Sequence, residues 1–366
     1  MMRLLLLGFL PLAVVLHYFV PIGPIWVFVT GAIAVAVLAD WVRRATEQVA
    51  AHAGASIGGL LTVSFGSIAE LLLAFFVLTE SGAAVVRAQI TGSIIGTSLL
   101  GLGLAMLAGG ARFERQHFKR ERAGLLGSML MLVVIALLLP AIFDLATAAR
   151  QSRQHAPPIS TEDLSLAVSV ALLLVYAGNL VYTLVTHRDV FSADKNGHEP
   201  EDEGGDGDGA TWSLARALAI LVASTIAIAI GAEIVSGALQ ATAQTLGLPL
   251  LFLGVVPLAL IGTSSDLLAA VAFGRQDRMG LVMSICVGSS IQMALVIAPL
   301  LVLASWAIGQ PMTLLFSDPL DLFAIAGTAF IVNAITGDGE TTWFEGLLLV
   351  GVYVLLALAY FFTGSA

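Results

Sequence analysis

The chain alternates long apolar segments with short polar connections, a pattern typical of helices that cross a bilayer. A membrane-spanning helix needs about 20 mostly apolar residues. Eleven segments meet or approach this length, at residues 3–20, 24–42, 56–78, 84–109, 122–143, 164–186, 213–237, 249–273, 279–306, 320–335 and 343–362. The pattern predicts an all-α polytopic membrane protein with about 11 transmembrane helices.

Composition supports a membrane protein and argues against several other classes. Apolar residues make up 58% of the chain, charged residues only 11%, and the mean hydropathy is +0.97, whereas a soluble domain carries about 25% charged residues. One cysteine and six scattered histidines offer no disulfide and no metal cluster. No P-loop GxxxxGK[ST] motif, HExxH motif or nucleic-acid-binding pattern is present. We therefore expect a transporter, and neither an ATP-driven pump nor an enzyme.

The distribution of lysine and arginine predicts the orientation in the membrane. With the N-terminus inside, 13 of the 16 basic residues lie on or near the cytoplasmic side, and only Arg87, Arg150 and Arg153 lie outside. Cytoplasmic loops carry an excess of basic residues. We expect a cytoplasmic N-terminus, in a bacterial plasma (inner) membrane.

An acidic segment divides the chain into two halves. Its sequence, NGHEPEDEGGDGDG, is typical of a solvated linker. The predicted organisation is an extra N-terminal helix, a first five-helix repeat, an acidic cytoplasmic linker and a second five-helix repeat, at residues 1–20, 21–186, 187–212 and 213–366.

The two halves carry a repeated motif. A shift of 196 residues, without gaps, places GSIAE at 66–70 on GTSSD at 262–266, and Gly-Ser at 92–93 on Gly-Ser at 288–289. The copies lie five predicted helices apart, so they enter the membrane from opposite sides. Inverted repeats with polar, glycine-bearing segments at matching positions are typical of secondary transporters, whose site lies near the bilayer midplane.

The repeated motif places one carboxylate in each half, at membrane depth. Glu70 is the only charged side chain in 57–78, and such a charge costs several kcal/mol, roughly 3 or more. Carboxylates, hydroxyls and carbonyls freed at a glycine are hard oxygen ligands suited to Ca²⁺, Na⁺ or Mg²⁺. Facing carboxylates away from water also favour proton binding, and a metal ion would displace those protons. The predicted site residues are Glu70, Asp266, Gly66, Ser67, Gly262, Thr263, Ser264, Ser93 and Ser289.

These residues resemble the signatures of the calcium/cation antiporter superfamily, most closely its cation/proton exchanger (Ca²⁺/H⁺ antiporter) branch. The matching stretches are GGLLTVSFGSIAELLLAFFVL (58–78), VVRAQITGSI (85–94), PLALIGTSSDLLAAV (257–271) and MGLVMSICVGSSIQMALVIAP (279–299). The resemblance covers nearly the whole chain and implies two inverted five-helix halves. It also implies that Gln292, in GSSIQ, lines the ion pathway near Ser289 and Ser290.

The chain departs from the family pattern at four positions of the signatures. The family usually has Gly-Asn-Ala-Thr/Ala-Glu in both signatures, often with a His after the Glu of the second. Here Ser67 and Thr263 stand at the Asn positions, Asp266 replaces the second Glu, and Leu267 stands at the His position. The acidic pair is kept but the carboxamide oxygens are lost, which leaves the choice of ion open.

We expect a secondary antiporter that exports a cation, with calcium favoured, in exchange for protons by alternating access. Its partners are the transported cation, protons and the lipid bilayer, with no cofactor and no nucleic acid; a homo-oligomer stays open. The nearest alternative is a Na⁺ or K⁺ antiporter on the same fold. A cation channel, with the acids in a selectivity ring, and an intramembrane protease are further alternatives, and the inverted repeat favours a carrier over a channel.

Overall fold

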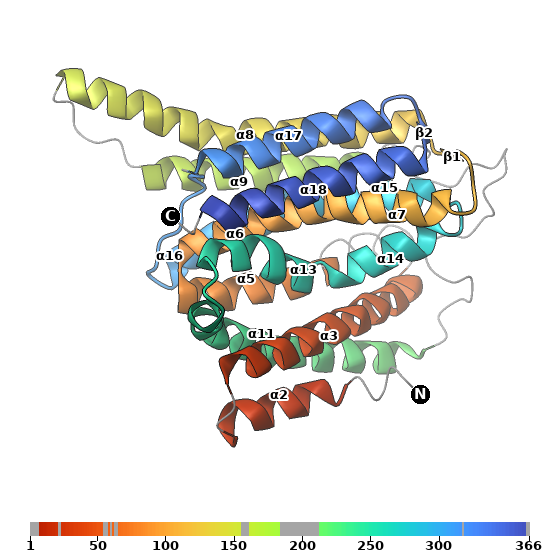
Figure 1. The fold of residues 1–366 in the computed structure, drawn as a ribbon, viewed down its shortest axis with the longest axis horizontal. Helices are drawn as coiled ribbons and strands as arrows, with labels where there is room; N and C mark the ends of the chain where they lie inside the picture. Colours follow the sequence, from red (N-terminus) through yellow and green to blue (C-terminus); the bar gives the residue numbers. More distant parts are fainter. Residues whose placement is uncertain are drawn as a thin grey trace.

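The protein is a bundle of helices that run mostly along one direction (Figure 1). The computed structural model describes residues 7–20, 23–53, 58, 61, 65–154, 161–183, 212–316 and 318–363. The acidic linker at 187–211 lies outside the described residues, as do 3–6 of the first predicted span and most of 56–64.

The first half contains seven described α-helices, one π-helix (labelled η) and a short strand. Their bounds are α2 (Phe9–Tyr18), α3 (Pro24–Ala53), α5 (Ile68–Ser81), α6 (Ala83–Ile95), η1 (Gly96–Gly101), α7 (Leu102–Gly110), β1 (Gln116–His117), α8 (Arg120–Gln154) and α9 (Thr161–Val181). Helices α6, η1 and α7 follow one another without a break and form one span.

The second half follows the same plan, with interruptions in two of its spans. Its elements are α11 (Leu214–Leu246), α12 (Leu250–Leu253), η3 (Gly254–Leu258), α13 (Ala259–Gly262), α14 (Ser264–Gly274), α15 (Met279–Gln292), η4 (Met293–Ile297), α16 (Ala298–Ala307), α17 (Pro319–Thr336), β2 (Glu340–Thr341) and α18 (Trp343–Thr363).

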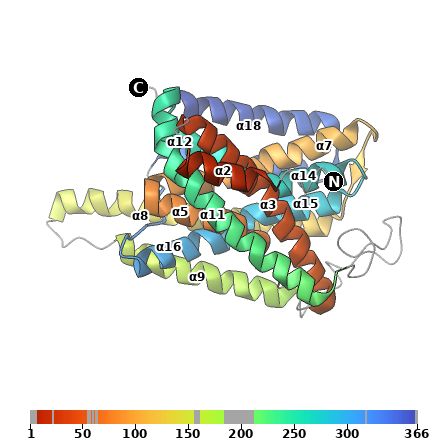
Figure 2. The same ribbon diagram turned by 90° about the horizontal axis from the view of Figure 1, so that it is seen from below.

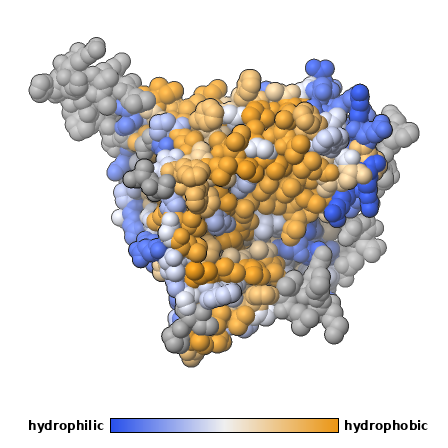
Figure 3. All heavy atoms as spheres, in the orientation of Figure 1, coloured by the Kyte–Doolittle hydropathy of each residue, from blue (hydrophilic) through white to orange (hydrophobic). Residues whose placement is uncertain are grey.

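The predicted fold class is confirmed, but the predicted number of spans is not. Eight described helices are long and apolar enough to cross a membrane, and the bent pair 250–262 and 264–274 makes a ninth. Helices α2 and α5, at 10 and 14 residues, are shorter than a span within the described ranges. Figure 3 shows apolar side chains over most of one face, with hydrophilic ones gathered mainly at one end.

Loops between helices meet at that end of the bundle. Strands β1 and β2 pair there, with Gln116 opposite Thr341, and Arg115 forms an ion pair with Glu340 at 3.0 Å. The side-chain nitrogen of Gln116 also donates to the carbonyl of Gly274 at 3.0 Å, which ties in the turn after α14. The loops at 111–119, 275–278 and 337–342, all predicted to be cytoplasmic, therefore share one end, and the side of the membrane that this end faces stays a prediction.

The π-helices follow the same repeat as the sequence motif. A shift of 196 residues places 97–101, in η1, on 293–297, which is η4. A π-turn inserts one extra residue into an α-helix and frequently occurs at functional sites. The irregularity of the backbone is therefore duplicated together with the polar residues.

Helices α3 and α11 pack against each other and, with α2, form a layer at one side of the bundle (Figures 1 and 2). A Cβ atom on Gly31 would come within 2.9 Å of Val235 Cγ2, and one on Gly231 would come within 2.9 Å of Val35 Cγ2. Each helix thus presents a glycine to a valine of the other. Such reciprocal contacts are expected where a two-fold axis relates two inverted halves.

Helix α6 packs just as closely on the first part of the bent span. A Cβ atom on Gly92 would overlap the backbone carbonyl of Val255 and lie 2.7 Å from Ala259 Cβ. One side of α6 is therefore held directly against η3 and α13.

We predict that Gly92→Ala destabilises the protein, because the added methyl group meets backbone that cannot move aside. Overpacking of this kind costs about 1–3 kcal/mol. Thermal unfolding of the purified protein in detergent measures the effect. Gly351→Ala in α18 is the matched control, since Gly351 is exposed and its Cβ would meet no described atom within 4 Å. Equal unfolding midpoints for the two variants would contradict the packing described here.

Candidate functional site

The span that carries Asp266 is broken next to this residue. The helix axes of 250–262 and 264–274 differ by 60°, and Thr263 stands at the break with φ −88° and ψ 3°. The hydroxyl of Thr263 donates to the Ala259 carbonyl at 2.9 Å, and that of Ser264 donates to the Ile261 carbonyl at 2.8 Å. These two hydroxyls satisfy carbonyls around the break, and Asp266 lies in the first turn of α14.

Glu70 occupies the equivalent place in the first half. Helix α5 begins after Ser67, whose φ of −101° and ψ of 20° resemble those of Thr263, and Glu70 lies in its first turn. The N-terminus of a helix carries partial positive charge and favours a carboxylate. Each half therefore presents its acid at the start of a half-helix, a frequent arrangement at the ion sites of transporters.

The end of α13 touches Glu70. A Cβ atom on Gly262 would lie 3.2 Å from Glu70 Cγ and 3.7 Å from Glu70 Cα, so the backbone of Gly262 rests against the Glu70 side chain. Only 3% of Glu70 is exposed, whereas Asp266 is partly exposed. The two carboxylates are close enough to repel each other when both are ionised.

The two acids differ in their hydrogen bonds. Asp266 accepts from the hydroxyl of Ser289, and from that of Ser265 at 3.5 Å. In the first half, the Oε2 atom of Glu70 and the hydroxyl of Ser93 are both buried and have no partner among the described residues, although Ser93 is the repeat counterpart of Ser289. Unpaired polar atoms are costly away from water. The Glu70 half thus has the capacity to bind a cation or a proton.

Two carboxylates would have to share a cation with neutral oxygens. Across the described ranges, no three His, Cys, Asp or Glu side chains come together as a metal site. The positive charge of Arg43 in α3 acts on Asp266, while Arg43 pairs with Asp40 at 3.0 Å and with Glu47. In the sequence, Arg43 counts only among the basic residues that predict the orientation, and its place four residues before Glu47 is the signal of a charge network.

The remaining predicted site residues have different surroundings. The hydroxyl of Ser290 lies 2.7 Å from that of Thr97 and 2.6 Å from that of Ser98, and donates to the Ile94 carbonyl at 3.1 Å. Ser290 therefore joins α15 to the α6–η1 span. Gln292 is partly exposed at the end of α15, next to η4.

Gly66 lies four residues before Glu70, just ahead of α5. It is exposed, and a Cβ atom there would meet no described atom within 4 Å. The repeat-related glycines therefore differ, since Gly262 is buried against Glu70.

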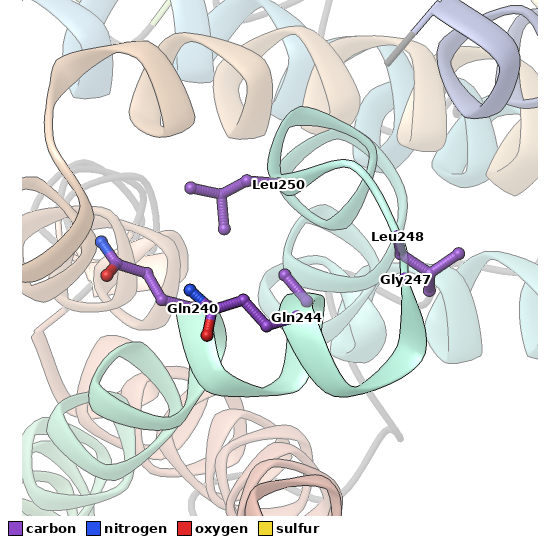
Figure 4. Close-up of a pocket in the computed structure, with 6 residues that line it drawn as sticks. Gln240, Gln244, Gly247, Leu248 and Leu250 are labelled. Atoms are coloured by element: carbon purple, nitrogen blue, oxygen red, sulfur yellow. The ribbon is translucent and has the colours of Figure 1, made fainter. Parts of the chain in front are cut away.

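A surface hollow lies elsewhere, where α11 turns into α12 (Figure 4). Its lining residues are Gln240, Ala243, Gln244, Gly247, Leu248 and Leu250. None of these residues is acidic, so this hollow lacks the charge that a cation site needs.

Comparison with known sequences identifies relatives over nearly the full length. Residues 23–185 and 216–362 match the sodium/calcium exchanger protein family. A Ca²⁺/H⁺ antiporter of Aphanothece halophytica is 37% identical over 368 residues, covering 98% of this chain and 95% of the relative. The Ca²⁺/H⁺ antiporter ChaA of Bacillus subtilis is 32% identical over 338 residues, covering 91% of each chain.

Solved structures share the fold. The structure of native YfkE superposes with a TM-score of 0.82 at 27% identity, covering 99% of this chain and 100% of that one. The H⁺/Ca²⁺ exchanger CAX matches with a TM-score of 0.69 over 99% and 92% of the two chains, and at 16% identity this likeness concerns the fold alone.

The adjacent serines of α15 should respond differently to substitution. We expect Ser290→Ala to lower the unfolding free energy by roughly 1–3 kcal/mol, because it leaves buried polar groups of the neighbouring span with fewer partners. Ser289→Ala, which removes one donor to the partly exposed Asp266, should lower it less. Thermal unfolding in detergent compares the two variants, and a larger loss for Ser289→Ala would show that the roles are reversed.

Proposed function

The chain belongs to the sodium/calcium exchanger protein family, and we propose that it is a secondary antiporter that exports Ca²⁺ in exchange for H⁺. Curated relatives that are 32–37% identical are Ca²⁺/H⁺ antiporters. The observation that carries the proposal is the matched placement of Glu70 and Asp266, each in the first turn of a half-helix, with Glu70 packed on Gly262 at the break before Asp266. Calcium is favoured over sodium or potassium because the full-length relatives named above carry calcium.

The exchange follows from the charge of the two acids. Two ionised carboxylates balance the double charge of one Ca²⁺, and they are equally neutralised by two protons. In both loaded states the site carries no net charge, which lowers the cost of closing it within a medium of low dielectric constant. An empty site with two ionised acids carries a double negative charge, so closing it still costs free energy. Ca²⁺ and protons therefore compete for the same carboxylates and cross the membrane alternately.

The helix layers offer a division between a moving part and a fixed part. The α2, α3 and α11 layer is joined internally by the reciprocal contacts of Gly31 and Gly231, while α5, α6, α13 and α14 surround the acids. Sliding of the α3–α11 pair over the half-helices would open the site to one side and then to the other. Rocking of one helix group against another around a fixed site is the usual form of alternating access.

The proposal assigns a role to each site residue and an orientation to the chain. Glu70 and Asp266 bind the cation, with Ser93 and Ser289 beside them. Gly66, Ser67, Gly262, Thr263 and Ser264 shape the two breaks; Ser290 and Gln292 stay predicted lining residues. The N-terminus faces the cytoplasm of a bacterial cell, with the basic loops on the same side.

Proton flux in proteoliposomes tests this proposal. Vesicles with an acidic interior receive CaCl₂, NaCl, KCl or MgCl₂ outside, and a pH-sensitive dye reports the loss of the gradient. We expect Ca²⁺ to dissipate it, and Glu70→Gln and Asp266→Asn each to reduce the flux to that of empty liposomes. Each variant removes one negative charge that Ca²⁺ requires. Dissipation by Na⁺ or K⁺ instead of Ca²⁺ would retain an antiporter and refute the choice of ion.

Competition makes a separate prediction about pH. Protons occupy the carboxylates that Ca²⁺ needs, so the apparent KM for Ca²⁺ should rise as the external pH is lowered, while the maximal rate changes less. Initial rates across a series of Ca²⁺ concentrations at several pH values measure it. A KM that does not depend on pH, with the flux intact, would mean that protons and Ca²⁺ use separate sites.

A further inference from the structure

A buried glutamine lies in the same helix as Ser93. Gln89, in α6, is fully buried, and neither its amide nitrogen nor its amide oxygen has a hydrogen-bond partner among the described residues. Leaving a buried polar group unpaired costs roughly 1–3 kcal/mol. The contacts of the fold therefore do not account for an amide at this position.

The position of Gln89 in α6 turns it toward the Glu70 half of the site. Residues four apart in an α-helix share a face, so Gln89 lies one turn from Ser93 and on the same side. Ser289, the repeat counterpart of Ser93, donates to Asp266, and the two-fold relation between the halves directs Ser93 toward Glu70.

The turn between α5 and α6 determines where Gln89 lies along the helix axes relative to Glu70. The two helices are joined through Gly82 alone, whose φ of 87° is accessible to glycine, and they pack on each other. In such an antiparallel pair, Gln89 lies nearer to the turn than Glu70 does. Gln89 is thus placed between the Gly82 turn and the acids.

The surrounding helices keep this side of α6 in place. The contact of Gly92 with Val255 and Ala259 holds α6 against the first part of the bent span, and the same span brings Gly262 onto Glu70. Gln89 Oε1, Ser93 Oγ and Glu70 Oε2 are then three buried oxygens on the packed helices α5 and α6, all without a partner in the described ranges.

We propose that the side-chain oxygen of Gln89 is a further ligand of the transported cation, an inference that rests on the proposed Ca²⁺/H⁺ exchange. Amide carbonyl oxygens are among the hard ligands that Ca²⁺ prefers. A cation beside Glu70 would satisfy all three unpaired oxygens. The repeat counterpart of Gln89 is Ile285, so the second half offers no such ligand. The amide ligand is therefore supplied by the first half alone, on the side of the site that faces the Gly82 turn.

The substitution Gln89→Leu tests the proposal, because leucine has a similar size and no polar atom. Replacing an unpaired buried amide by an apolar side chain removes its desolvation cost. In EDTA, the unfolding midpoint of the purified variant should therefore be unchanged or higher. The KM for Ca²⁺ in the proteoliposome assay should rise about ten-fold, as expected for a lost contact to a charged group, and the rise of the midpoint on adding CaCl₂ should become smaller.

Two further variants make the test specific. Thr91→Val changes another fully buried polar side chain of α6, two residues away and on a different face, and it should leave the KM unchanged. Gln89→Glu keeps an oxygen ligand and should bind Ca²⁺ at least as well as the unaltered protein at alkaline pH.

The possible failures are distinguishable. If Gln89→Leu lowers the midpoint in EDTA and leaves the KM unchanged, Gln89 is a structural residue, and the inference is wrong while the exchange function stands. If the unaltered protein shows no Ca²⁺-dependent proton flux, the proposed function fails and the inference fails with it. The unaltered protein is therefore assayed first.

Discussion

The arrangement of the site depends on one close contact, in which the side chain of Glu70 lies on the backbone of Gly262. A Cβ atom at position 262 would come within 3.2 Å of Glu70 Cγ, so a larger residue there would force α5 and α13 apart. The contact joins the start of α5 to the end of α13, two residues before α14 begins. Because each acid also belongs to a helix that packs on α6 or α15, the positions of Ser93 and Ser289 follow from the same crossing.

This crossing is possible because the surrounding helices exclude lipid from it. Broken helices expose backbone groups that lipid cannot satisfy. Thr263 and Ser264 bond to carbonyls near the break, and Ser290 fastens the adjacent spans to each other. The hydroxyl groups of Thr263 and Ser264 thus bond to irregular backbone, while Glu70 Oε2 and Ser93 Oγ of the first half have no partner in the described ranges. Serine hydroxyls at repeat-related positions therefore differ in their hydrogen bonds, because the two halves pack against different neighbouring residues.

The apolar pattern of the sequence predicted most of the helices, and it missed where polar residues extend them. The pattern ended the second span at 42, yet α3 continues to Ala53, because Asp40, Arg43 and Glu47 pair with one another along its surface. The repeat correctly matched the positions of the acids. It could not distinguish Ser289 from Ser290, since the direction of each side chain depends on which helix packs there. The π-helices were not predictable, because an extra residue in a turn leaves the hydropathy pattern unchanged.

Gln89 has a side-chain oxygen, whereas its repeat counterpart, Ile285, has none. This difference has a consequence for transport in each direction. If a cation entering from the Gly82 side meets one more ligand than a cation entering from the opposite side, the two access states have different dissociation constants. Detailed balance then fixes the ratio of those constants to the ratio in which the empty and the loaded carrier favour each state. A carrier built from two repeated halves would then have kinetics that differ between the two faces of the membrane. It would saturate at a lower cation concentration on one face, while the ion gradients alone decide the net direction of transport.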